Sequence, residues 1–263
     1  MKNNNLIILF IADIVGKPGL DITTLYLPGL IKKYDADIII ANGENAHQGK
    51  GMTETLAAQY HSIGIDVITG GNHIWDNYKV FTAFKNDPNL LRPINYPRGL
   101  PGKGYIIHTV KSGIKVGVLN IQGRTFMQPI DCPFQAAKSV VEKINTETNI
   151  IIVDFHAEAT AEKRAMGWFL NGKVSALLGT HTHVQTADEQ ILPGDTAYIT
   201  DAGMTGPHHS VIGMKKEVAI RRFTMQTPQK YDIASEDVRF QGVVVEINPA
   251  NGKGVSIERI SLP

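Results

Sequence analysis

The sequence has little cysteine, since Cys132 is the only one among 263 residues. It has no second cysteine with which to form an internal disulfide, and a zinc cage of thiolates needs at least two. Any metal site in this chain must therefore be built from histidine, carboxylate and amide groups. The lack of a cysteine framework also favours a cytoplasmic location.

Net charge is nearly absent as well, because 26 lysines and arginines oppose 25 aspartates and glutamates. This balance gives no general electrostatic reason to bind an acidic membrane or a nucleic acid, so we expect neither as a stable partner. No apolar run approaches the roughly 18 residues of a membrane helix. The run Leu6–Ala12 is short for a signal-peptide core and Asp13 follows it at once, so we interpret it as a buried strand.

Repeats, low-complexity segments and convincing linkers are also lacking. With 43% hydrophobic and 19% charged residues, the composition excludes a disordered or fibrous chain. A chain of this length can bury roughly three quarters of its extended surface without a covalent staple. We therefore predict one large domain over residues 1–263.

Short runs rich in isoleucine and valine recur between polar residues and glycines, which is typical of strands covered on both faces. We predict strands at Leu6–Ala12, Asp37–Ala41, Asp66–Thr69, Lys115–Asn120, Ile150–Val153, Ala176–Leu178 and Ala197–Thr200. Helical patterns lie at Thr53–Gly64, Pro133–Ile144, Thr160–Leu170 and Ile22–Tyr34, the last of which Pro28 should kink or split. We expect two hairpins, Tyr105–Val110 with Lys115–Ile121 and Gln241–Ile247 with Gly254–Ile260. The pattern indicates a mixed α/β fold.

Polar side chains follow the predicted strands directly, in the segments Asp13, Asn42–Asn45, Gly70–His73, Asp154–His156 and Gly179–His183. In open α/β sheets, ligands bind in the crevice beyond the C-terminal ends of the strands. Carboxylate, amide and imidazole groups should therefore gather at one rim. His181 and His183 could share one face of a strand, or reach two adjacent ions from a loop.

Each of these segments alone has an ordinary structural interpretation. Asp13 could belong to a turn, Asn42–Asn45 could be a simple turn, and Asn72 could cap a helix. His156 could be a hydrogen-bonded buried histidine. Because all of them occur in order at strand ends, together they indicate a metal centre, whose donors suit iron, manganese, zinc or nickel.

At these residues the chain resembles the calcineurin-like metallophosphoesterases, whose motifs run in the order D-x-H, G-D, G-N-H-D/E, a lone His and G-H-x-H. The counterparts here are Asp13-Ile14-Val15, Gly43-Glu44, Gly71-Asn72-His73, His156 and His181-Thr182-His183. Three positions depart from the pattern. Val15 replaces the first histidine, Glu44 replaces the bridging aspartate, and Thr180 replaces a glycine.

These departures resemble one subgroup, the YmdB-like phosphodiesterases that open 2′,3′-cyclic AMP. Longer strings carry the likeness over nearly the whole chain, among them Asn42–Ala46, Gly71–Asp76, Asp154–Glu158, Gly179–Val184 and Thr200–Pro207. The resemblance implies a four-layer metallophosphoesterase-like sandwich, in which helices flank two mixed β-sheets and the site lies at strand ends.

The resemblance also implies two divalent or trivalent metal ions, with iron or manganese as the metals. The implied ligand sets are Asp13, Glu44, Asn45 and His183 for one ion, and Glu44, Asn72, His156 and His181 for the other. Glu44 would bridge the ions, and Asn45 would supply the ligand that Val15 cannot. His73 would be a catalytic residue that faces the substrate, and Asn72 would also hold a phosphate oxygen.

The activity so implied is hydrolysis of 2′,3′-cyclic AMP or a related cyclic nucleotide by attack of a metal-bound hydroxide on phosphorus. His73 would act as the general acid that protonates the leaving ribose oxygen. Alternatives stay open: a phosphomonoesterase or nuclease on the same scaffold, a non-catalytic protein that senses a nucleotide, or a metal-dependent amidase. The family likeness also suggests a homo-oligomer.

Several residues near the motifs could serve the site or have only a structural role, namely His47, Trp75, Asp76, Glu158, His208 and His209. In the functional interpretation, Asp76 would orient His73 and Glu158 would orient His156. Trp75 would stack on a base. The three histidines would line the mouth of the site or meet the nucleotide.

Overall fold

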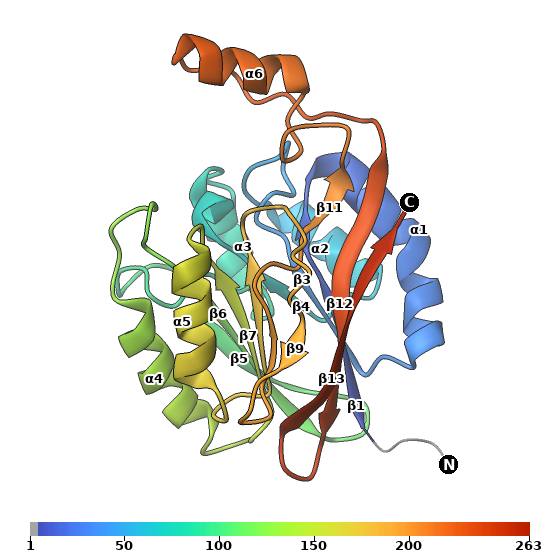
Figure 1. The fold of residues 1–263 in the computed structure, drawn as a ribbon, viewed down its shortest axis with the longest axis vertical. Coiled ribbons are helices and arrows are strands. Elements are labelled where there is room, and N and C mark those ends of the chain that lie inside the picture. Colours follow the sequence, from blue (N-terminus) through green and yellow to red (C-terminus); the bar gives the residue numbers. More distant parts are fainter. Residues whose placement is uncertain (1–4) are drawn as a thin grey trace.

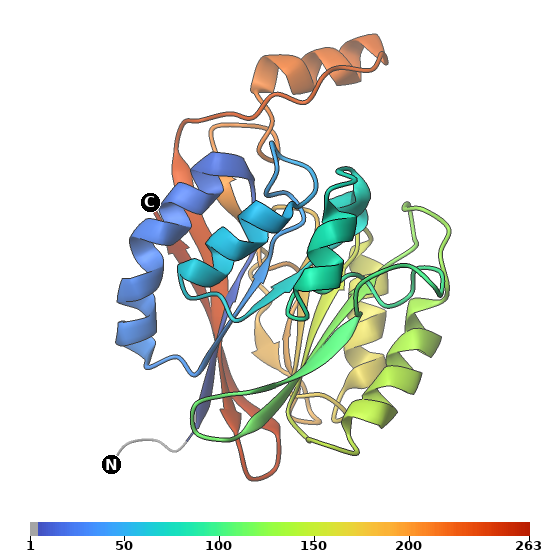
Figure 2. The ribbon, with the colours of Figure 1, turned by 180° about the vertical axis from the view of Figure 1, so that it is seen from behind.

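The computed structural model describes residues 5–263 and contains two mixed β-sheets between layers of helices (Figures 1 and 2). The first sheet contains β1 (Leu6–Ile11), β2 (Asp13–Ile14), β3 (Ile38–Asn42), β4 (Val67–Thr69), β11 (Met204–Pro207), β12 (Val238–Asn248) and β13 (Lys253–Leu262). The second contains β5 (Tyr105–Thr109), β6 (Lys115–Gln122), β7 (Ile151–His156), β8 (Ala176–Thr180), β9 (Gln190–Ile191) and β10 (Ala197–Ile199). The helices are α1 (Gly16–Tyr34), α2 (Glu54–Ser62), the 3₁₀ helix η1 (Asn72–Trp75), α3 (Val80–Asn86), α4 (Pro133–Ile144), α5 (Thr160–Leu170) and α6 (Lys216–Met225).

The strands bury both faces, because successive side chains of a strand point to opposite sides of its sheet. Phe10 of the first sheet and Ile152 of the second belong to one apolar cluster between the sheets. Their neighbours turn outward: Leu9 packs in a cluster with α1, α2 and α3, and Val153 in a cluster with α4 and α5. This arrangement confirms the predicted four layers of helices, sheet, sheet and helices.

The strand order brings the ends of several strands to one edge of the molecule. The first sheet has the order β2-β11-β12-β1-β3-β4, with β13 paired to β12, and the second has the order β5-β6-β7-β8-β10-β9. Strands β1, β3 and β4 are parallel, as are β6, β7, β8 and β10. The predicted hairpins are the antiparallel pairs β5–β6 and β12–β13.

Helix α1 is longer than predicted and is not split by its proline. It begins at Gly16 and runs without interruption through Pro28. Pro28 cannot donate to the carbonyl of Thr24, four residues earlier. Both residues are exposed, so water can satisfy that carbonyl and the helix continues.

Helix α6 stands away from the body of the two sheets (Figures 1 and 2). Its exposed apolar side chains are Ile220, Phe223 and Met225, which are 57%, 70% and 61% exposed. The homo-oligomer suggested by the family likeness stays a prediction. Among residues 5–263, no helix combines the length and the apolar character needed to cross a bilayer.

An ion pair between His61 of α2 and Asp87, which follows α3, joins two helices on the outer face of the first sheet. His61 Nε2 lies 2.9 Å from Asp87 Oδ2, and Nδ1 lies 2.7 Å from the carbonyl oxygen of Ile65. The hydrogen bond to Asp87 raises the pKa of His61, because both ring nitrogens face acceptors. Burial alone would raise the pKa of Asp87, but His61 outweighs it and the pKa is lowered.

We expect this pair to make stability depend on pH. The raised pKa of His61 gives a contribution that is complete below pH ~6.5 and is lost as the pH rises through that raised pKa. The lowered pKa of Asp87 gives a contribution that is present above pH ~4 and is lost on further acidification. Asp87→Asn should therefore cost about 1 kcal/mol of unfolding free energy at pH 5.5 and less at pH 8.5. Equal losses in chemical denaturation at both pH values would contradict this account.

Candidate metal centre

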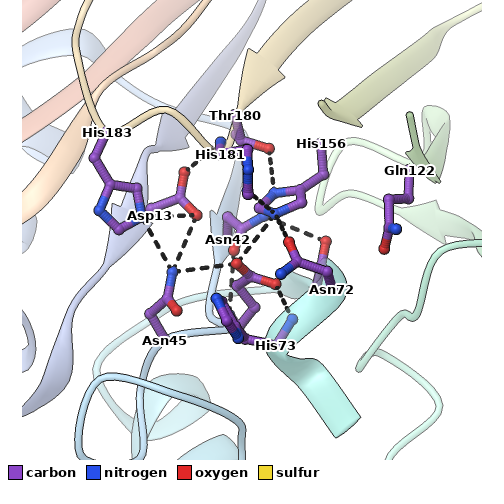
Figure 3. Close-up of polar contacts among 12 residues, drawn as sticks. Asp13, Asn42, Asn45, Asn72, His73, Gln122, His156, Thr180, His181 and His183 are labelled. Atoms are coloured by element: carbon purple, nitrogen blue, oxygen red, sulfur yellow. Dashed lines mark hydrogen bonds and ion pairs between the residues drawn. The ribbon is translucent and has the colours of Figure 1, made fainter. Parts of the chain in front are cut away.

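The seven proposed ligands lie together where strands of both sheets end, and Figure 3 labels all of them except Glu44. They are Asp13 on β2, Glu44 and Asn45 after β3, Asn72 at the start of η1, His156 at the end of β7, and His181 and His183 after β8. Strand β8 ends at Thr180, so His181 and His183 lie on a loop rather than on a strand. Their φ angles are +102° and +63°, and this backbone sends the two rings to different groups of donors.

One group of donors converges on His156. Its Nε2 lies 3.0 Å from Glu44 Oε1, 3.0 Å from Asn72 Oδ1 and 3.0 Å from His181 Nδ1. Candidate ligand atoms of Glu44, His156 and His181 all lie within 4.8 Å of one another. These four residues are the set expected around one of the two ions.

The other group converges on the side-chain amide of Asn45. Its Nδ2 lies 3.2 Å from His183 Nε2, 3.3 Å from Glu44 Oε1 and 3.5 Å from Asp13 Oδ1. The amide nitrogen thus occupies the point where three acceptors converge, which is where a cation would lie. A rotation of the amide by about 180° would present its oxygen as a ligand instead. Glu44 Oε1 contacts both groups, as a bridging ligand must.

In two of the histidines, the ring nitrogen that points away from the other ligands lies within hydrogen-bond distance of an acceptor oxygen. His183 Nδ1 lies 3.0 Å from the carbonyl oxygen of Ile212, and His181 Nε2 lies 3.0 Å from Glu158 Oε2. An oxygen that can only accept fixes the proton on the outward nitrogen. The inward nitrogen of each ring is then unprotonated, and its lone pair faces the other ligands.

His156 is oriented in the same way through two buried residues. Its Nδ1 lies 2.9 Å from Thr180 Oγ1, and the Thr180 hydroxyl donates to Asp154 Oδ1 at 2.7 Å. Because the hydroxyl proton is already used, Thr180 accepts from Nδ1–H and leaves His156 Nε2 free for a cation. Asp154 also accepts from Asn42 Nδ2 at 3.0 Å and from Thr69 Oγ1, so it ties the strand ends of both sheets together.

The two carboxylates are buried, and their only basic neighbours among the described residues are histidines. Asp13 is 0% and Glu44 is 1% exposed, and no lysine or arginine of residues 5–263 has a side-chain nitrogen within 4.0 Å of either carboxylate. Burial raises the pKa of Asp13 well above its usual range. Two buried carboxylates with no lysine or arginine beside them are a typical environment for a bound cation.

The neighbouring histidines His156 and His181 respond to this environment in opposite ways. Burial lowers the pKa of His156, but the neighbouring Glu44 outweighs it and raises that pKa to about 9. Burial also raises the pKa of Glu44, yet His156 lowers it to about 2. Burial together with His156 lowers the pKa of His181 to about 2. One proton on His156 therefore balances the cluster without metal, and a cation would serve the same purpose.

Gly71 leaves the room that this cluster needs. A Cβ atom at Gly71 would collide with Glu44 Oε2 and with the ring of His156. The glycine is required here by close approach, because its φ of −159° is open to any residue. Gly71 therefore lets the backbone approach the ligand side chains closely.

His73 lies beside the ligands but joins them only through its backbone, whose N–H donates to Glu44 Oε2 at 2.8 Å. Its ring Nδ1 lies 2.9 Å from Asp76 Oδ2, and Lys50 Nζ lies 3.8 Å from the same oxygen. Asp76 thus orients His73, as its functional interpretation predicts. The Nε2 atom of His73 has no hydrogen-bond partner among the described residues, so it is free to meet a bound molecule.

A cavity of about 230 Å³ opens over the two groups of donors. Its walls are Glu44, Asn45, Gly49, His73, Glu158, His181, Thr182, His183, Ile212 and Tyr231. Ile212 and Tyr231 come from the segments on either side of α6, and the sequence analysis did not find them. No strand end or motif precedes either residue, so no local signal marks them.

Two residues near the ligands lack the contacts that their functional interpretations predict. Glu158 contacts His181 rather than His156, and it lies before the start of α5. Trp75 packs internally, with its ring centroid 5.4 Å from that of Tyr96, instead of facing the cavity. Each of these contacts joins residues that are distant in the sequence, so the position of Glu158 or Trp75 in the chain does not reveal it.

The remaining candidate histidines lie outside the cavity. His47 lines a separate pocket between α1 and α2. His208 Nε2 lies 3.1 Å from the carbonyl oxygen of Met204, and His209 Nδ1 lies 2.7 Å from Glu236 Oε2. These contacts support a structural role for His208 and His209, and His47 lies away from the ligands.

A four-layer α/β sandwich that gathers imidazole, carboxylate and amide groups at strand ends is the architecture of the metallophosphoesterases. Within that class the chain belongs to the YmdB-like family, whose model matches residues 9–260. The family predicted from the motifs is therefore confirmed.

Three relatives cover nearly the whole chain. The 2′,3′-cyclic-nucleotide 2′-phosphodiesterase of Bacillus subtilis (strain 168) is 48% identical over 256 residues, which are 96% of each chain. A crystallised protein of Thermus thermophilus is 39% identical, with a TM-score of 0.90 over 98% of this chain and 100% of that one. A phosphatase of Mycoplasma pneumoniae, also crystallised, is 33% identical, with a TM-score of 0.92 over 98% of this chain and 94% of that one.

Proposed function

We propose that this protein is a dinuclear-metal phosphodiesterase that hydrolyses 2′,3′-cyclic AMP or a related cyclic nucleotide. The single observation that carries the proposal is the convergence of three inward imidazole nitrogens and two buried carboxylates beside a free imidazole, that of His73. The name of the Bacillus subtilis relative supports the substrate class. Iron or manganese suits these donors.

The two groups of donors match the two implied ligand sets. One cation would be held by Asp13, Asn45 and His183, the other by Asn72, His156 and His181, and Glu44 would contact both. When bound, two such ions supply a water acidic enough to ionise near neutral pH and neutralise charge on a phosphate. The absence of a lysine or arginine within 4.0 Å of Asp13 or Glu44 among residues 5–263 supports this assignment.

His73 would act as the general acid. Asp76 holds Nδ1, which leaves Nε2 to carry the proton that the departing ribose oxygen needs. The backbone N–H of His73 is held by Glu44 and its ring by Asp76, so the ring is positioned in the cavity beside the ligands. A protein that only binds nucleotide has no use for such a proton donor, which favours an enzyme over a sensor.

The cavity suits a small ester better than a polymer. Its volume is about 230 Å³, and the net charge of +1 offers little attraction to a long polyanion. The apolar surfaces of Ile212 and Tyr231 offer contacts for a ribose or a base. A cytoplasmic location and a small-molecule substrate remain part of the proposal.

A comparison of four substrates tests the activity. We expect kcat/KM for 2′,3′-cyclic AMP to exceed that for 3′,5′-cyclic AMP, a phosphomonoester and RNA by at least about tenfold, because the five-membered ring is strained. Separation of 2′-AMP from 3′-AMP in the product would identify the leaving oxygen. Preference for the monoester or RNA would favour the alternative hydrolases, and tight binding without turnover would favour the sensor.

A further inference from the structure

A fully buried ion pair lies behind the loop that carries His181 and His183. Lys163 Nζ, on α5, lies 2.6 Å from Asp201 Oδ2, which follows β10, and both side chains are 0% exposed. Removing two charges from water is costly, so such a pair needs further hydrogen bonds to be tolerated. Asp201 makes these bonds, and two of them go to the loop of the histidines.

The residue that Asp201 holds is Thr182, which lies between the two histidines. Asp201 Oδ2 accepts from the backbone N–H of Thr182 at 3.0 Å and from its hydroxyl at 2.8 Å. The φ angles of His181 and His183, on either side, are +102° and +63°, a region that residues with a side chain rarely adopt. Two hydrogen bonds to a buried carboxylate at the residue between them hold this unfavourable backbone in place.

The conformation of this loop determines where the two rings point. His181 Nδ1 reaches the group around His156, whereas His183 Nε2 reaches the group around Asn45. In an extended chain, two residues two positions apart would point to the same side. If Thr182 were released, a relaxed loop would separate one or both imidazole nitrogens from the other ligands.

We propose that Lys163 and Asp201 are positioning residues that act through Thr182, and that they preset His181 and His183 to bind two cations. This inference rests on the proposed metal centre. It adds three residues that make no contact with a cation, and it assigns the buried ion pair a role in cation affinity. Its simpler alternative is that the pair only fastens α5 to the second sheet.

The inference can be tested by titrating Mn²⁺ into the metal-free full-length protein and its variants by calorimetry. Thr182→Val removes the hydroxyl donor at nearly constant volume, and Asp201→Asn weakens the acceptor for both bonds. We expect each change to weaken binding of at least one Mn²⁺ by roughly 10–100-fold, as loss of an orienting partner does. Thr182→Ser, which keeps the hydroxyl, should restore the affinity of the natural protein.

Thr196→Val provides a matched control for loss of stability. Thr196 is buried, and its hydroxyl donates to the carbonyl oxygen of Val174 at 2.7 Å, away from the metal centre. This variant should unfold at a lower temperature yet bind Mn²⁺ normally. The proposal is overturned if the Thr182 and Asp201 variants also lose only stability and keep their affinity for Mn²⁺.

Failure of the metal centre itself would look different. If the natural protein binds no Mn²⁺ or only one ion per chain, the proposed centre is wrong and the positioning role is lost with it. If the natural protein binds two ions and Thr182→Val binds them equally well, only the positioning role is wrong. Thr182→Val keeps the buried ion pair, so the test does not depend on the folding of Asp201→Asn.

Discussion

Replacing Glu44 with glutamine should lower turnover of 2′,3′-cyclic AMP by roughly 10³-fold or more and reduce the metal content of the protein. Glu44 Oε1 is shared by the two groups of donors, so the change affects both proposed ions at once. An amide has one acceptor oxygen and no negative charge, and its N–H₂ group would compete with the cations. The side-chain volume is nearly unchanged, so the fold should persist.

Metal content by inductively coupled plasma mass spectrometry, measured together with kcat, would check this result. Glu189→Gln is a suitable control, because Glu189 forms a partly buried ion pair with Arg259, away from the ligands. The control should keep both metal and activity. A Glu44→Gln protein that keeps full metal content and full activity would show that Glu44 does not bridge the ions.

Replacing His73 with alanine should leave the metal content unchanged and lower kcat by roughly 10²–10⁴-fold. His73 meets the ligands only through its backbone N–H, which alanine retains. The loss should depend on the leaving group, because an alkoxide needs a proton whereas a p-nitrophenolate does not. The variant should therefore hydrolyse methyl p-nitrophenyl phosphate almost normally.

Asp76→Asn extends this test to the residue that orients His73. The amide can still contact His73 Nδ1, so we expect a smaller loss than that of His73→Ala, again confined to substrates with poor leaving groups. If His73→Ala instead loses metal, then His73 is a ligand. An equal loss on both kinds of substrate would show that it has another role than proton donation.

Much of the site could be predicted because most of its residues directly follow strands that are clear in the sequence. The apolar runs before Asp13, Glu44 and His156 are short and continuous, so the position at which each run stops is clear from the sequence. Parallel strands bring these ends to one edge within each sheet, and the packing of the two sheets then brings the two edges together. The order of the motifs also indicated the superfamily, and the longer matching strings indicated the YmdB-like subgroup within it.

The contacts that orient the site were harder to predict because they join distant segments. Asp154 follows an apolar run like the other site residues, yet its carboxylate faces Thr180 and Asn42 inside the molecule. Lys163 looks like an exposed residue of an ordinary helix, but the structure buries it against Asp201. Only the packing of α5 against the second sheet buries Lys163 and leaves its neighbour Arg164 partly exposed.

Some elements lack a strong local pattern. Strand β11 contains Gly206 and Pro207, which are unfavourable in strands, and it forms because β2 and β12 lie on either side of it. Helix α6 buries Ala219 alone among its residues, so it has no clear apolar stripe. Tyr231 follows this helix and forms part of the cavity wall, and the sequence did not predict its role either.

The central claim is that seven side chains hold two cations, and anomalous diffraction from crystals of the Mn²⁺-loaded protein tests it most directly. The account predicts two manganese peaks about 3.5–4 Å apart. One should lie among Asp13, Asn45 and His183, the other among Asn72, His156 and His181, with the Glu44 carboxylate between them. A single peak, or peaks away from these residues, would contradict the account.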